Sequence, residues 1–252
     1  MKYLLSLFVA GLAGAGFFAV LPAHAASVGC VITTADINKI TAIQNDPTLT
    51  YSQEITQELA LRKQLVGQTI GCAQQDLQAL QAELQAASVD SDSQALQTQL
   101  LGRINDGANF YSIELANLDN AGIAGTQVIA KEVLDWRKST FTPLSGEVTN
   151  FLLWAQNQSL FNTAQTRMDQ TQRAVSFLES ASQNSDLQDG FNTAVASFAA
   201  AQNENNAAKA ALAQSLPPDQ SLALIKQSLD DLPTTYQNFF TVSALIKGIL
   251  PQ

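Results

Sequence analysis

The chain has 252 residues, of which 22 are acidic and 13 are basic, so its formal net charge is −9 at pH 7. A surface of this sign repels phosphate backbones, and nucleic acid is therefore not an expected partner. His24 is the single histidine, and we expect it to be removed with a leader peptide. This excludes histidine-based nucleophilic catalysis, histidine zinc sites and histidine pH switches in the mature chain.

The first 25 residues have the layout of a secretory signal peptide. Lys2 precedes an apolar run over residues 3–21, which Pro22 and the Ala-x-Ala triplet at 23–25 follow. Because such a triplet after a helix-ending proline is a typical cleavage site, we expect cleavage after Ala25 and an extracytoplasmic location, in the periplasm, at the cell surface or secreted. An uncleaved membrane anchor is the alternative, since the run approaches the roughly 20 residues that span a bilayer.

Two cysteines, Cys30 and Cys72, remain after the leader. An exported chain with an even number of cysteines usually pairs them, so the sequence predicts a structural disulfide between them. The bond would close a loop of about 42 residues and contribute roughly 4 kcal/mol on the chain-entropy account. Residues 27–29 resemble a lipoprotein signal only weakly, and neither cysteine lies in a Cys-x-x-Cys redox pair.

No proline occurs between Thr48 and Thr142, so long helices are allowed there. We predict a first long helix from about Thr50 to Ala87, roughly 55 Å in length. Its apolar residues are spaced alternately four and three after Val66, which is the heptad pattern of a helix that packs on another helix. They are Leu59, Val66, Ile70, Ala73, Leu77, Leu80, Leu84 and Ala87.

Residues 90–93, with the sequence DSDS, predict helix capping and a turn into a second, antiparallel helix. They also begin like a calcium loop, but Ala95 and Leu101 stand where that loop needs glycine and glutamate. The second helix is predicted to run through the NDG sequence at 105–107, because its apolar pattern stays in phase there. That pattern consists of Leu101, Ile104, Ala108, Tyr111, Leu115 and Leu118.

Later in the chain, glycine and proline residues suggest where helices bend or end. Gly122 and Gly125 predict a close backbone approach or a chain bend. Thr142 and Pro143 are in the order typical of an N-cap and a first helical residue, so a third long segment is expected to begin there. Residues 217–218, both proline, are expected to end a fourth segment, and Pro233 to interrupt a last one over 221–250.

The predicted fold is all-α, because no strand-like alternation competes with the helical patterns. We expect residues 26–252 to form a single elongated antiparallel bundle of long, coiled-coil-like helices, with a subdivision near 139–145 as the alternative. No cofactor or metal site is predicted. Glu54 and Glu58, or Glu132 and Asp135, share helix faces, but di-metal bundles add histidine motifs, and a two-carboxylate glycosidase remains only as a minor alternative.

Aromatic residues are densest around the predicted junction near 139–145. They are Trp136, Phe141, Phe151, Trp154 and Phe161. Aromatic side chains dominate interaction hot spots, so an exposed cluster would be an interaction surface. Burial in a core is the favoured interpretation, because large aromatic side chains chiefly serve packing.

The leading hypothesis is an exported, non-enzymatic structural or interaction protein of the bacterial cell envelope, such as a subunit of a surface or secretion assembly. Its partner would be another protein or a second copy, since heptad faces flanked by glutamines over 74–99 can serve another chain. The alternative is a binding protein for a lipid or a small hydrophobic ligand, held near Trp136 and Trp154. The tail at 238–250 suits peripheral membrane contact and is too short to span a bilayer.

In outline, an exported helical bundle of this size is similar to the helical periplasmic subunits of bacterial conjugation and secretion pili. The likeness is one of layout, and no sequence motif carries it. It implies only that the hypothesis of an assembly subunit is the one to test first.

Overall fold

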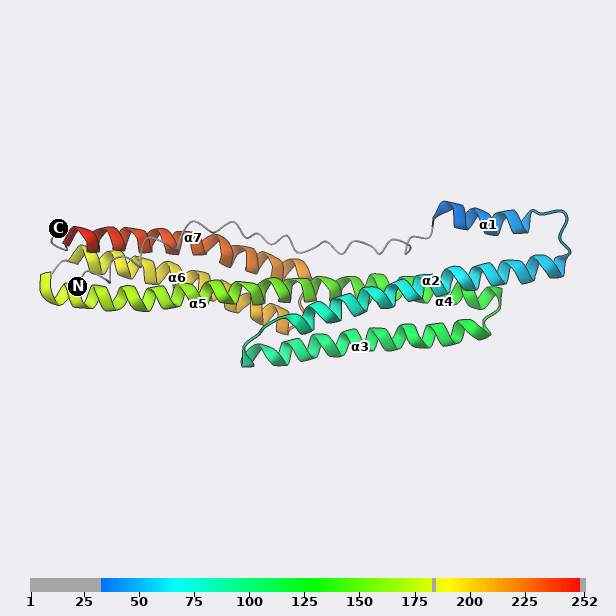
Figure 1. Ribbon diagram of the computed structural model, residues 1–252, viewed down its shortest axis with the longest axis horizontal. Helices are drawn as coiled ribbons and strands as arrows, with labels where there is room; N and C mark the ends of the chain where they lie inside the picture. Colours follow the sequence, from blue (N-terminus) through cyan, green and yellow to red (C-terminus); the bar gives the residue numbers. More distant parts are fainter. Residues whose placement is uncertain (1–32, 183–184, 250–252) are drawn as a thin grey trace.

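A computed structural model of the protein describes residues 33–182 and 185–249. All the regular elements in these ranges are helical, which confirms the all-α prediction (Figure 1). The predicted leader and Cys30 lie outside the described residues. Cleavage after Ala25 and the disulfide from Cys30 to Cys72 therefore stay predictions.

The described helices form two sets of three along an elongated molecule, and α1 folds back beside α2 (Figure 1). Helices α2, α3 and α4 pack together in one set, and α5, α6 and α7 pack together in the other. The elements are α1 (Thr34–Gln44), α2 (Tyr51–Ala86), α3 (Ser91–Asn120), α4 (Ile123–Trp136), the π-helical turn η1 (Arg137–Phe141), α5 (Thr142–Ser182), α6 (Ser185–Ala213) and α7 (Pro218–Ile249).

Side-chain caps begin the first helices close to the predicted places. Thr50 is the N-cap of α2, where its hydroxyl accepts a hydrogen bond from the Gln53 amide and the Gln53 side chain bonds back to Thr50. Asp90 is the N-cap of α3, as expected. Its Oδ1 accepts a hydrogen bond from the Ser93 hydroxyl at 2.5 Å. The Asp90 side chain accepts no hydrogen bond from a backbone amide of the first turn.

The heptad patterns are confirmed in part. In α2, the predicted positions from Ile70 to Leu84 are all buried. In α3, Ile104, Tyr111 and Leu118 are buried as predicted. The intervening buried positions are Leu100, Gly107 and Glu114, each one residue before the predicted Leu101, Ala108 and Leu115. A pattern of apolar residues does not reveal a buried glycine or glutamate, so the prediction chose Ala108 and Leu115, and it does not distinguish between the adjacent leucines Leu100 and Leu101.

The third long helix, α5, begins at Thr142 as predicted, but Thr142 is not an N-cap, because one continuous helical path runs from α4 through η1 into α5. Proline lacks an amide hydrogen, and its ring normally clashes with the carbonyl four residues earlier. Here the turn widens by one residue, because the Thr142 amide donates to the Arg137 carbonyl in a π-helical bond. The Thr142 hydroxyl donates to the same oxygen at 3.0 Å. The helix therefore passes Pro143 without breaking.

The predicted interruption at Pro233 is also wrong, because α7 continues through it to Ile249. The apolar side of the predicted membrane-contacting tail faces the protein interior: Phe239 and Val242 are buried, while Phe240 is 51% exposed. This use of the apolar side in the core leaves little of it for a lipid surface. Among the described helices, none is both long and apolar enough to cross a bilayer.

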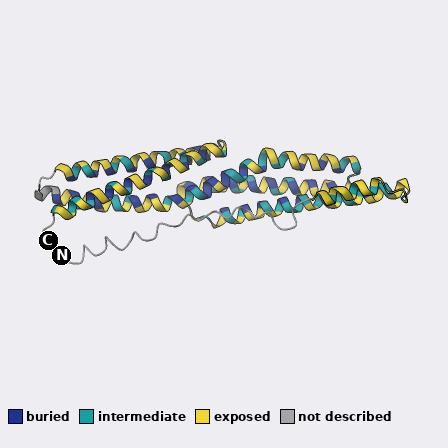
Figure 2. Cartoon of the chain, turned by 90° about the horizontal axis from the view of Figure 1, so that it is seen from above, coloured by how far each residue is buried: buried dark blue, intermediate teal, exposed yellow. Residues whose placement is uncertain are grey.

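The hydrophobic core runs through the junction between the two sets of helices (Figure 2). One cluster of buried residues extends from Ile70 in α2 through Phe141 and Leu144 to Leu212 in α6 and Ile225 in α7. Residues 139–145, the predicted alternative boundary, thus adjoin a continuous core. Separate folding of the two halves stays a prediction.

Trp136 packs into a notch that Gly107 leaves in the surface of α3. A Cβ at position 107 would lie 2.6 Å from Trp136 Cη2 and 3.1 Å from a Leu77 methyl. The Trp136 ring stacks on Phe110 with centroids 5.0 Å apart and meets Tyr111 edge-on at 5.0 Å. The glycine of the NDG sequence is therefore a steric requirement of the contact between α3 and α4.

We expect Gly107→Ala to lower the free energy of unfolding by about 1–3 kcal/mol, because overpacking outweighs the better helix propensity of alanine. The matched control is Gly102→Ala on the same helix, where a Cβ would meet nothing within 4 Å. That change should stabilise the protein by about 1 kcal/mol. Urea unfolding of the natural protein and the two variants measures both changes in unfolding free energy. Equal changes in the two variants would contradict a close contact between Gly107 and Trp136.

Candidate functional site

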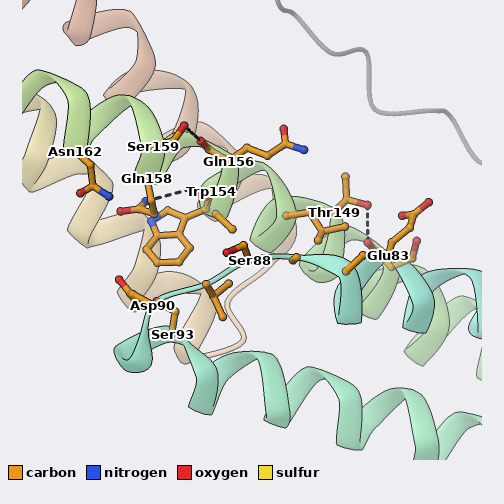
Figure 3. Close-up of a pocket in the computed structure, with 16 residues that line it drawn as sticks. Glu83, Ser88, Asp90, Ser93, Thr149, Trp154, Gln156, Gln158, Ser159 and Asn162 are labelled. Carbon is orange, nitrogen blue, oxygen red and sulfur yellow. Dashed lines mark hydrogen bonds between the residues drawn. The ribbon is translucent and has the colours of Figure 1, made fainter.

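An open groove lies where the tip of the α2–α3 hairpin meets α5, and its volume is 1140 Å³ (Figure 3). The hairpin contributes the end of α2, the connection over residues 87–90 and the first turn of α3. Helix α5 contributes residues from Ser145 to Asn162. The groove therefore lies between the two sets of helices.

The α5 wall of the groove is a stripe of mainly polar residues, interrupted by Leu152, on one helix face. Ser145, Thr149, Leu152, Gln156 and Ser159 line it at alternate spacings of four and three, which keeps them on the same side of the helix. The Thr149 hydroxyl donates to the Ser145 carbonyl at 2.8 Å, and the Ser159 hydroxyl donates to the Gln156 carbonyl at 3.0 Å. These side chains keep acceptor capacity toward the groove.

The opposite wall is the hairpin tip, which Gln97 of α3 holds in place. The Gln97 amide donates to the carbonyls of Leu84 and Ala87 at 2.7 and 3.2 Å, and so satisfies exposed carbonyls at the end of α2. Glu83 and Asp90 are the acidic residues of this wall, and the described lining contains no lysine or arginine. The groove therefore combines polar and apolar surface, with the apolar share the larger, and its charged residues are acidic.

Trp154 lies at one end of the groove and is fixed by α6. Its ring is buried, and its Nε1–H donates to the Asn205 carbonyl at 3.2 Å. Gln158 and Asn205 exchange side-chain hydrogen bonds at 3.1 and 3.3 Å, and the Lys209 ammonium lies 5.5 Å from the Trp154 ring centroid. The indole is therefore a buried side chain that supports one end of the groove and is held in place by α6.

Arg103 of α3 connects three elements beside the groove. Its guanidinium forms a two-pronged ion pair with Glu147 of α5, which is buried. It also donates to the Ser215 hydroxyl at 3.2 Å in the α6–α7 connection. Ser215 has a φ of 50°, in the left-handed region that often ends a helix. Arg103 thus links the hairpin to the second set of helices.

The predicted aromatic cluster is separated in space. Trp136 packs on α3, whereas Phe151 lies 6.1 Å from Trp154 and Phe161 lies 6.1 Å from Phe198 of α6, as centroid distances. The Arg137 guanidinium, which bonds Asp76 at 2.8 Å, lies 5.0 Å from the Phe141 ring centroid. Four of the five predicted aromatic residues are buried, and Trp136 is half-buried. The packing interpretation is therefore favoured over an exposed surface.

The predicted carboxylate pairs do not converge on the groove. Glu58 is buried and accepts hydrogen bonds from Arg62 Nε at 2.6 Å and from the Gln44 amide at 3.0 Å. Asp135 is exposed and pairs with Lys131. Among the described residues no group of three or more histidine, cysteine or acidic side chains is placed to hold a metal ion.

Glu114 is a buried carboxyl that the apolar pattern did not reveal. It is 7% exposed, and its Oε2 is among the buried side-chain atoms with no hydrogen-bond partner in the described part of the chain. Burial raises the pKa of Glu114 above its ordinary value of 4.5, and the nearby charge of Glu132 raises it further, while a hydrogen bond from Asn117 lowers it. Glu114 thus binds a proton more readily in the folded protein.

Comparisons with protein-family models, with curated proteins and with solved structures find no match to this chain.

The groove could not have been located from the sequence. Its α5 stripe has the same heptad spacing as the apolar patterns, but hydroxyl and amide side chains at such positions read as an ordinary solvent-facing side. Asp90 was identified as a helix cap, after a calcium loop had been rejected, and the opposing hairpin tip reaches α5 through tertiary packing alone. Arg103 and Glu147, which are 44 residues apart, gave no signal of their pairing.

We expect Arg103→Ala to destabilise the protein by about 2–3 kcal/mol, because it leaves the buried Glu147 carboxylate without its cation. Arg103→Ala/Glu147→Gln should recover part of this loss, since the neutral amide costs less to bury. Lys131→Ala, which breaks the exposed pair with Asp135, should change stability little. Chemical unfolding measures the stability of all three variants. Equal losses of stability in Arg103→Ala and Lys131→Ala would contradict a stabilising ion pair between Arg103 and the buried Glu147.

The raised pKa of Glu114 predicts a pH-dependent stability. Protonated Glu114 stabilises the folded state fully below pH 4.5, the ordinary value, and this contribution is lost as the pH rises through the raised pKa. The difference in unfolding free energy between the natural protein and Glu114→Gln should therefore fall as the pH rises above 4.5. Asp36→Asn is the control: hydrogen bonds from Lys39 and Thr33 lower the Asp36 pKa to about 2, so its contribution is constant over that range. A flat Glu114 difference would contradict the prediction.

Proposed function

We propose that the protein is an exported, non-enzymatic interaction protein of the bacterial cell envelope, and that the groove between the hairpin tip and α5 receives a segment of a partner macromolecule. The observation that carries this proposal is the groove itself. It belongs to both sets of helices and is supported from beneath by Trp154, Asn205 and the Arg103–Glu147 pair.

The size and chemistry of the groove support a macromolecular partner. Small-molecule sites usually occupy about 300–1,000 Å³, enclose their ligand and are mostly apolar. This groove measures 1140 Å³, is open along its length, and presents serine, threonine, asparagine and glutamine side chains. Such side chains suit hydrogen bonds to a polar chain. The alternative of a bound lipid or small hydrophobic ligand keeps support of its own, because more of the groove's lining surface is apolar than polar. The open shape of the groove favours a longer chain over an enclosed ligand.

The proposal assigns no catalytic role to the groove. The Asp90 carboxylate accepts the Ser93 hydroxyl at 2.5 Å, and the other predicted acids lie elsewhere, with Glu58 held by Arg62 and Gln44. Acid–base catalysis requires carboxyl groups that flank a substrate at a common site. A structural or interaction role needs no such pair.

The register of α1 on α2 supports the disulfide that is part of the proposal. The two helices are antiparallel, with Gln44 bonded to Glu58, and Ile40 and Arg62 line the same small pocket. In two antiparallel helices, residues that lie opposite each other have residue numbers with a constant sum. The two pairs share one such sum, and the numbers of Cys30 and Cys72 add to the same value. Cys72 lies half-buried on α2.

Photo-crosslinking in the cells that produce the protein tests the proposal. Benzoylphenylalanine at Gln156, in the groove, should give a covalent adduct with one partner macromolecule. The matched control is the same substitution at Gln172, an exposed glutamine of α5 beyond the groove. Equal adducts at both positions, or none at Gln156, would contradict a partner site in the groove.

The uncrosslinked protein from the same cells tests export. Its intact mass should correspond to a chain that begins at Ala26 and lacks two hydrogens, those of the Cys30 and Cys72 thiols. A chain that keeps its leader and both thiols in the cytosolic fraction would count against export, whatever the groove binds.

A further inference from the structure

The two walls of the groove differ in charge. The hairpin wall carries the two acidic residues of the described lining, Glu83 near the end of α2 and Asp90 at the start of α3, whereas the α5 wall carries none. Residues 64–102, which run from the middle of α2 into the first part of α3, include no lysine or arginine. The groove therefore presents negative charge along its hairpin side.

The helix ends at the hairpin tip do not offset these carboxylates. The last carbonyls of α2 carry a negative partial charge, and its last turn contains no basic residue. The first amides of α3 carry a positive partial charge of similar size, so the two helix ends cancel. Asp92 in the first turn of α3 adds a further negative charge. The tip is therefore negative overall, and it attracts cations.

Asp90 is the acid best placed to receive a cation in the groove. Asp90 is exposed, and the Ser93 hydroxyl donates to its Oδ1 at 2.5 Å. A carboxylate has about four acceptor positions on its two oxygens, so Asp90 keeps acceptor capacity. Figure 3 shows Asp90 and Ser93 on the hairpin tip, with Trp154 and Gln158 of α5 across the groove from them. A lysine or arginine bound there would form a charge-assisted hydrogen bond, which is stronger than a neutral one.

Apolar side chains of both walls contact the same space beside this acid. Most of them are small, so they let the backbone of an occupant approach closely. They are Ala86, Ala87, Val89, Leu152 and Ala155, with the buried Trp154 at one end. A helix that binds in a groove places its apolar side inward and keeps charged residues at its edges. Such a helix would match both the apolar lining and the acidic tip.

A helical occupant suits the groove better than an extended one. An extended peptide needs partners for its backbone amides and carbonyls, which the edge of a sheet supplies, and the described elements include no strand. A helix pairs these groups internally. The α5 wall extends from Ser145 to Asn162, which is long enough for about 17 residues of helix, roughly 25 Å at 1.5 Å per residue.

A polysaccharide fits the lining less well. Sugar rings pack their C–H faces on exposed aromatic rings, and the aromatic residue of the described lining, Trp154, is 2% exposed. A polysaccharide that carries carboxylates or phosphates would be repelled by Glu83 and Asp90. Both observations favour a polypeptide in the groove.

We propose that the occupant of the groove is an amphipathic helix of a partner protein, with an apolar side against the two walls and a lysine or arginine that pairs with Asp90. The inference rests on the proposed function, because it names the partner of the same groove. The net charge of −9 on the whole chain adds a long-range attraction for a basic partner, and the pair with Asp90 sets where its cation binds.

The crosslinked adduct at Gln156 tests this inference, because digestion and mass spectrometry identify the segment that benzoylphenylalanine captures. The segment should be protein, with apolar residues spaced three and four apart and a lysine or arginine within about two helical turns of the captured residue. A synthetic peptide of that segment, titrated into the purified full chain, is then the probe of charge. Asp90→Asn should raise its dissociation constant about threefold or more, since asparagine still caps α3 but carries no charge.

The matched control is Asp106→Asn, because Asp106 is an exposed acid of α3 outside the groove and its removal changes the net charge equally. Asp106→Asn should leave the dissociation constant nearly unchanged, and a peptide with glutamine in place of lysine and arginine should bind the natural protein and Asp90→Asn equally. A polysaccharide adduct, a captured segment without lysine or arginine, or equal effects of the two variants would overturn this inference and leave a partner site in the groove. The absence of an adduct at Gln156 would instead contradict the proposed function, and this inference with it.

Discussion

The rest of the structure depends on one helical path, which runs from Ile123 to Ser182 and is shared by both sets of helices. The π-helical turn at Arg137–Phe141 lets this path pass Pro143 without a break. Because α4 and α5 are parts of the same path, the α2–α3 hairpin that packs on α4 must extend alongside the beginning of α5. The groove lies where the tip of that hairpin meets α5.

A continuous apolar core and a buried ion pair connect the two sets of helices around this meeting point, and further polar contacts join α5 to α7. Glu147 is buried against Arg103, and the Asn150 amide donates to the Pro218 carbonyl at 2.7 Å and to the Ser221 hydroxyl at 3.0 Å. Such contacts require particular partners at particular distances, whereas apolar surfaces tolerate sliding. They therefore define how the beginning of α7 and the hairpin sit against α5.

The groove combines two kinds of surface. Apolar side chains from both walls alternate with hydroxyl and amide groups and two acids, so the groove suits a segment that excludes water and also forms hydrogen bonds. Because its walls belong to both sets of helices, a bound segment would contact both sets.

The sequence by itself determined the helical class, the extent of α2, the turn at Asp90 and most buried positions of α2, because apolar spacing and capping residues act over a few neighbouring residues. It placed the start of α5 at Thr142 but missed the widened turn that joins this helix to α4, and it misjudged Pro233, since local proline rules do not register such a turn or the packing that holds a long helix together. Only the tertiary structure decided that Gly107 and Glu114 are buried, that Arg103 pairs with Glu147, and that a groove exists. These features depend on which helices meet and at what level, and that is set by contacts between residues far apart in the chain.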